Sequence, residues 1–108
     1  MTTFDERERA FEAKFKLDQE VQFKVNVRRD KLLGLWAAEQ MGLSGDAAKA
    51  YALSVVDAEF SEPDHDASHK VLRDLQAKGV VVDDKAFHKE VERCRLLAVA
   101  QVSEDSKR

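Results

Sequence analysis

The sequence predicts an all-α fold, an antiparallel four-helix bundle preceded by an amphipathic N-terminal helix. The chain has 108 residues with one proline and four glycines, and strong helix formers such as Ala, Leu, Glu and Lys are abundant. Apolar residues recur three and four positions apart in several segments, which is the period of a helix with one buried face. Because 44% of the residues are hydrophobic, we expect one domain with one core.

The N-terminal segment combines an aromatic stripe with dense charge. Phe4, Phe11 and Phe15 fall on one narrow face of a helix. Thr3 and Glu6 have the spacing of a capping box, so we expect this helix to begin at Phe4. The three rings fill either this protein's own core, as a fifth helix, or the core of a partner.

A second helix is expected to follow a joint near Asp18, where the aromatic stripe ends. Its apolar face contains Val21, Val25, Leu32, Leu35 and Trp36. Between residues 21 and 27 apolar and polar residues alternate as in a strand. We still expect a helix, because no other segment offers a strand to pair with it.

The next helix is delimited by glycine, serine and proline. Gly42 can take the left-handed conformation that ends one helix, and Ser44 can cap the next. We expect this helix to run to about Phe60, before a turn at Pro63. Its predicted inner face contains Ala48, Tyr51, Ala52, Val55 and Val56.

Two further helices complete the predicted bundle. A short one ends at Gly79, and Asp83 caps the last. Their predicted inner faces contain Val71, Leu72 and Leu75, and then Phe87, Val91, Cys94, Leu97 and Ala98. Short connections favour antiparallel neighbours. The predicted organisation is therefore an N-terminal helix (1–18), a bundle (19–102) and a disordered tail (103–108).

Composition argues against several classes of function. The net charge is −3, so we expect no nucleic-acid partner, and Arg28, Arg29 and Lys31 are interpreted as a solvated helix face. The single cysteine, Cys94, excludes an internal disulfide. No apolar run approaches the ~20 residues of a membrane span, which predicts a cytoplasmic protein without direct membrane insertion.

The sequence shows no catalytic constellation, so we expect no enzyme activity and no cofactor. His65 and His69 have a spacing that could hold a metal on a helix, but no third soft ligand is nearby. Cys94 lies on an apolar face without a histidine at helical spacing, and Lys78-Gly79 lacks the glycine-rich loop of a phosphate site. We therefore expect no metal site.

Two long blocks of sequence carry a family resemblance. Residues 1–15 (MTTFDERERAFEAKF) and 28–43 (RRDKLLGLWAAEQMGL) closely resemble the zeta-type ATPase inhibitor subunit family of alphaproteobacterial ATP synthases. The spacing of Pro63, Leu72, Leu75, Gly79 and Val80 also matches. The resemblance implies a four-helix bundle that carries a mobile N-terminal inhibitory helix.

The resemblance also implies a partner and a site. In this family the helix enters the catalytic head of ATP synthase, wedges between a catalytic and a non-catalytic subunit against the central stalk, and blocks rotation in the hydrolysis direction. The bound protein would lie at the cytoplasmic face of the inner membrane. The implied partner-binding residues are Phe4, Asp5, Glu6, Arg7, Arg9, Phe11, Glu12 and Phe15.

The free energy of such binding sets a condition on the N-terminal helix. Burying three Phe rings contributes about 5 to 9 kcal/mol, whereas ordering some fifteen disordered residues costs ~1 to 2 kcal/mol apiece. The helix must therefore be partly formed beforehand, or its other contacts must be extensive. The alternative function is a non-enzymatic scaffold or adaptor bundle, with or without a bound nucleotide or metal.

Overall fold

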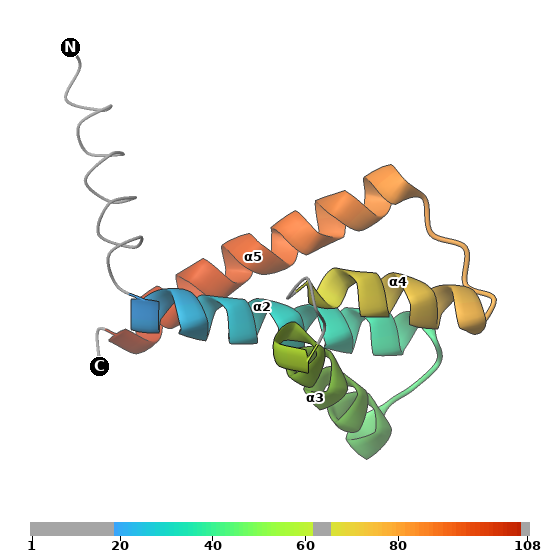
Figure 1. Cartoon of the computed structure of the whole chain (residues 1–108), viewed down its shortest axis with the longest axis horizontal. Helices are drawn as coiled ribbons and strands as arrows, with labels where there is room; N and C mark the ends of the chain where they lie inside the picture. The colour runs from blue at the N-terminus through green and yellow to red at the C-terminus, as the bar shows by residue number, and fades with distance from the viewer. Residues whose placement is uncertain (1–18, 62–65, 107–108) are drawn as a thin grey trace, which may run out of the picture.

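The computed structural model describes residues 19–61 and 66–106. These residues form four helices, α2 (Gln19–Gln40), α3 (Gly45–Ser61), α4 (Ala67–Ala77) and α5 (Asp84–Ser106). Consecutive helices alternate in direction, as Figure 1 shows. The predicted all-α four-helix bundle is confirmed, and the predicted N-terminal helix lies outside the described residues.

Helix α2 is the centre of the bundle, because it packs against each of the other three described helices. Helix α3 crosses it obliquely, and α5 approaches it most closely at the end where α2 begins (Figure 1). The α2–α3 crossing is tight at Gly34, where an added Cβ atom would lie 2.7 Å from the Cα atom of Ala52. A glycine in this helix therefore lets the two backbones approach.

The buried residues form two clusters along α2. The larger cluster contains Leu33, Ala37, Val55, Ala58, Ala67, Val71, Leu75, Phe87 and Cys94. The smaller contains Val25, Ala98 and Val102, at the beginning of α2 and the end of α5. Trp36 is half-buried, and its ring centroid lies 6.3 Å from that of Phe87. The prediction that Trp36 lies on the apolar face of this helix therefore holds for only part of its surface.

Two predicted faces differ from the observed ones. Leu97 was expected inside, but its side chain is 38% exposed. The buried direction of α5 runs through Phe87, Cys94 and Ala98, and Leu97 lies roughly a quarter turn away from it. On α2, Leu32, Leu35 and Trp36 are only partly buried, whereas the centre of the inner face contains Leu33, Ala37 and Ala38.

The helix ends predicted at Gly42, Gly79 and Asp83 are observed. Gly42 (φ 79°) and Gly79 (φ 75°) both take the left-handed conformation. In each case the following residue donates from its backbone N–H to a carbonyl five residues back, at 2.8 Å for Leu43 and 2.9 Å for Val80. At the N-termini, Asp66 accepts from Ser68 N (3.0 Å) and Asp83 accepts from Ala86 N (3.3 Å).

The other local predictions concern helix continuity. Residues 21–27 are helical, as expected, and Glu20 and Lys24 form an i,i+4 ion pair at 3.5 Å. Helix α5 continues to Ser106, whereas a disordered tail was predicted from residue 103. Contacts between the last turn of α5 and Arg28 on α2, described below, account for this extension.

Candidate functional site

The eight predicted partner-binding residues lie outside the described part of the chain. They are Phe4, Asp5, Glu6, Arg7, Arg9, Phe11, Glu12 and Phe15. The structure instead describes where this segment joins the bundle, because α2 begins at Gln19. The surface around that junction is the described part of the chain that lies nearest in sequence to the candidate site.

The beginning of α2 is held against the end of α5 by apolar and polar contacts. Val25 packs against Ala98 and Val102, with Val21 and Val99 at the edge. This apolar contact is the main tie, because burying a valine contributes about 1.5 to 3 kcal/mol. The junction with residues 1–18 is therefore anchored to the bundle within two turns of helix.

Arg28 adds polar contacts to the same junction. Its Nη1 donates to Oε1 of Gln101 and its Nη2 to Oδ2 of Asp105, both at 2.9 Å. The side chains of Arg28 and Asp105 are 34% and 57% exposed, so this ion pair contributes at most about 1 kcal/mol. It orders the last turn of α5 and contributes less to stability than the apolar contact.

An aromatic surface lies next to this junction. A hollow of ≈ 360 Å³ is lined by Phe23, Lys24, Val27, Arg28, Val102 and Asp105. The rings of Phe23 and Phe60 lie 5.5 Å apart and are 54% and 52% exposed. The sequence analysis selected neither residue. The available signal was that both are aromatic residues outside the predicted inner faces. Exposed aromatic side chains of this kind are frequent in protein interfaces.

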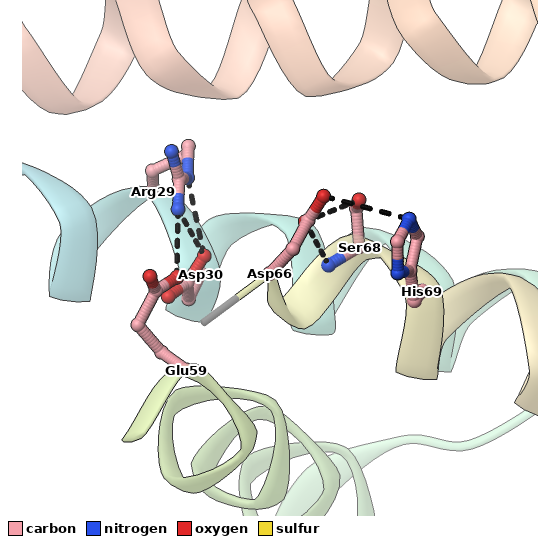
Figure 2. A network of polar contacts seen from close by, with 6 residues as sticks. All are labelled: Arg29, Asp30, Glu59, Asp66, Ser68 and His69. Carbon is pink, nitrogen blue, oxygen red and sulfur yellow. Dashed lines mark hydrogen bonds and ion pairs between the residues drawn. The ribbon is translucent and has the colours of Figure 1, made fainter. Parts of the chain in front are cut away.

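A buried polar cluster joins α2 to α3, as shown in Figure 2. The Arg29 guanidinium donates to Asp30 Oδ1 from Nε (3.1 Å) and Nη2 (3.0 Å), and to Glu59 Oε1 from Nη2 (2.8 Å). Asp30 is 1% exposed. Burial, together with the neighbouring Glu59 carboxyl, raises the pKa of Asp30 to about 8, although Arg29 opposes this shift.

This cluster corrects the interpretation of Arg28 and Arg29 as part of a solvated face. Both arginines make interhelical contacts, while Lys31 is exposed. The sequence did offer a signal, because Asp30 lies three residues before Leu33 and seven before Ala37, on the buried stripe of α2. A charged residue on such a stripe indicates a buried polar contact.

The histidines do not form a metal site within the described helices and loops. His69 Nε2 lies 3.6 Å from Asp66 Oδ2, and Ser68 also contacts Asp66 (Figure 2). Among the described residues, no three His, Cys, Asp or Glu side chains are grouped so as to hold a metal. His65 lies outside those residues, and His88 is exposed.

The remaining candidate reactive groups lie in the core or at a helix end. Cys94 is buried in the larger cluster, and burial together with the nearby Glu90 raises the pKa of its thiol to about 11. It is therefore a poor nucleophile at neutral pH. Lys78 and Gly79 end α4.

None of the four described helices combines the length and apolar character needed to cross a bilayer.

Comparison with known proteins identifies the family. A family model described as ATPase inhibitor subunit zeta matches residues 1–101, which include the N-terminal aromatic segment and nearly all of the bundle. No curated protein matches the sequence. The match covers far more than half of the 108 residues, and it agrees with the resemblance carried by the two sequence blocks. The chain therefore belongs to the ATPase inhibitor subunit zeta family.

Proposed function

We propose that this chain inhibits ATP hydrolysis by the proton-translocating ATP synthase, by inserting residues 1–18 at a catalytic interface of the enzyme's head. The observation that carries the proposal is the match to an ATPase inhibitor family over residues 1–101, because it is continuous from the aromatic segment into the bundle. The inserted helix contacts a catalytic subunit, a non-catalytic subunit and the central stalk. It acts as a steric block and catalyses no reaction itself.

The bundle supports this role by providing an anchored base for the segment. Helices α2 to α5 bury Leu33, Val55 and Phe87 among one another, so the described helices share a substantial core of their own. The beginning of α2 is tied to α5 through Val25 and Val102. Residues 1–18 are thus covalently continuous with a helix that is itself fixed in the bundle, so the segment is attached to a folded base.

The residues proposed to bind divide into an aromatic and a charged group. The Phe4, Phe11 and Phe15 rings supply apolar area, and the charged residues between them supply polar contacts at the rim of the interface. The partner would be reached from the cytoplasmic face of the inner membrane. Because the rings each contribute about 1.5 to 3 kcal/mol when buried, binding depends strongly on them.

The test is a titration of ATP hydrolysis by the isolated catalytic head with intact and shortened protein. Deletion of residues 2–18 should abolish inhibition while circular dichroism shows that the bundle remains folded. Replacing Phe11 and Phe15 with Ala should raise the concentration for half-inhibition by about 10²- to 10⁴-fold. Equal inhibition by the deleted protein would assign inhibition to another surface.

Phe60→Ala is the matched control, because it removes an exposed ring outside the segment. It should leave the concentration for half-inhibition nearly unchanged.

The exposed Phe23–Phe60 pair favours a second candidate function, an adaptor that binds partners through the bundle surface. That alternative is supported if Phe60→Ala weakens binding of the catalytic head and deletion of residues 2–18 does not.

A further inference from the structure

Two carboxyl groups lie buried against one guanidinium at the contact between α2 and α3. Asp30 is 1% exposed, and the side chains of Glu59 and Arg29 are 12% and 22% exposed. Both carboxyl groups accept hydrogen bonds from Nη2 of Arg29, at 3.0 and 2.8 Å. If both carboxyl groups are ionised, the cluster therefore carries two negative charges and one positive charge.

One atom of this cluster lacks a hydrogen-bond donor. Asp30 Oδ2 is buried and accepts no hydrogen bond from the described residues. A buried carboxylate oxygen without a donor is strongly unfavourable, because burial removes its water and nothing replaces it. The arrangement is therefore unfavourable for two ionised carboxylates and requires a further positive charge or a proton.

Among the described residues, the other groups facing the cluster do not supply a second buried cation. A cavity of ≈ 450 Å³ beside it is lined by Asn26, Arg29, Asp30, Leu33, Glu59, Asp66, Ser68, His88 and Val91. Asp66, before α4, is a further acid, and His88 on α5 is exposed. Cys94, also on α5, is close enough to Arg29 for its thiol to be affected by the guanidinium charge.

We propose that Asp30 and Glu59 bind one proton between them in the folded protein, and that this proton holds α3 against α2. With the proton on Oδ2, Asp30 donates a hydrogen bond to the Glu59 carboxylate instead of presenting a second negative charge. The cluster then has one negative carboxylate and one positive guanidinium. The proton is taken up from solvent, and no redox step is involved.

The direction of the pKa shift agrees with this geometry. Burial raises the pKa of Asp30 to about 8, with a further increase from Glu59, compared with about 3.9 for an unperturbed Asp. Because the folded pKa lies above the unfolded one, the protein gains a proton on folding. The associated stability is present below about pH 4 and is lost progressively as pH rises to about 8. Alkaline conditions should therefore weaken the α2–α3 contact.

The direct test follows the side-chain carboxyl ¹³C shifts of Asp30 and Glu59 in the full chain by NMR. A proton shared by the pair gives a titration step with an apparent pKa near 8, whichever carboxyl reports it. If both carboxyl groups titrate near their ordinary values of about 4, the proposal is overturned. This measurement needs no variant and so does not depend on whether a substituted chain folds.

A second test uses Asp30→Asn, in which the amide replaces the proton as donor to Glu59. The midpoint of urea unfolding of the wild-type protein should decrease as the pH is raised from 6 to 9. The variant should lose most of that pH dependence. Asp57→Asn, at an exposed position of α3, removes the same charge away from the pair and should retain the wild-type dependence. An Asp30→Asn variant with the unchanged wild-type slope would overturn the proposal.

Discussion

Tyr51 shows how a single side chain can join two helices of this bundle. Its hydroxyl donates to Oδ2 of Asp74 at 2.9 Å, which connects α3 to α4. Lys70 donates to the same oxygen at 2.8 Å, and its Nζ lies 5.4 Å from the centroid of the Tyr51 ring. Burial, followed by the effect of the Asp74 carboxylate, raises the pKa of Tyr51 above its ordinary range. The neutral phenol is thus the form that the fold stabilises.

The first prediction is that Tyr51 ionises at a higher pH than a free tyrosine. As the only tyrosine in the chain, it can be followed alone by phenolate absorbance. Because its folded pKa is raised, its contribution to stability is present below about pH 10 and is lost as pH rises further. Asp74→Asn should lower the midpoint. An ordinary midpoint in a chain that is still folded by circular dichroism would show that this contact does not persist in solution.

At the scale of helices, the α2–α3 contact depends on the absence of one side chain. An added Cβ atom at Gly34 would lie 2.7 Å from the Ala52 Cα atom and 3.2 Å from Cγ2 of Val55. The nearest of these atoms belongs to the backbone, so it cannot move aside without shifting α3. Glycine disfavours helix by about 1 kcal/mol relative to alanine, and close packing at the crossing accounts for its presence here.

The second prediction is that Gly34→Ala destabilises the protein, although alanine is the better helix former. Overpacking of this kind costs about 1 to 3 kcal/mol, which outweighs the gain in helix propensity in most of that range. Urea unfolding followed by Trp36 fluorescence gives the change in the free energy of unfolding. Gln22→Ala, at an exposed position of the same helix, should change it by less than about 0.5 kcal/mol. A more stable Gly34→Ala variant would mean that the helices separate easily.

The helix ends show what local sequence can predict. Gly42, Gly79 and Asp83 perform the terminal roles expected from their residue types. These signals are readable because the conformation or hydrogen bond involves only a few neighbouring residues. The end of α5 was predicted too early, because its last turn is ordered by contacts with Arg28, more than seventy residues away.

Side-chain partners between helices were less predictable than the helices themselves. The apolar period located the inner faces to within roughly a quarter turn, which was too coarse to place Leu97. It also did not identify Glu59 as the partner of Arg29 and Asp30, because that contact depends on the crossing of α2 and α3. The predicted partner-binding residues remain a prediction, since all of them precede Gln19.

At the scale of the whole molecule, α2 connects both buried clusters and leads directly from residues 1–18. The larger cluster draws on all four described helices, including Leu33, Val55, Val71 and Phe87. Separation of any one helix therefore exposes apolar surface on the others, which favours cooperative unfolding. Such a bundle should either remain a firm base for the N-terminal segment or unfold as a unit.

The third prediction tests this cooperativity through Cys94, the only cysteine. It is 0% exposed, and burial raises the pKa of its thiol to about 11. A thiol-specific disulfide reagent should therefore react only when the bundle opens. For a stability of about 5 kcal/mol or more, the native chain should be labelled at least about a thousandfold more slowly than the chain unfolded in urea.

The dependence of this labelling on urea identifies the opening reaction. If α5 leaves the core only on global unfolding, the free energy from Cys94 labelling and that from Trp36 fluorescence should agree and decrease with the same slope in urea. The two probes lie on α5 and α2, so their agreement reports on both sides of the α2–α5 contact. A smaller free energy and slope for Cys94 would mean that α5 detaches alone, and α2 would then lose its anchor at Val25 while the rest of the bundle stayed folded.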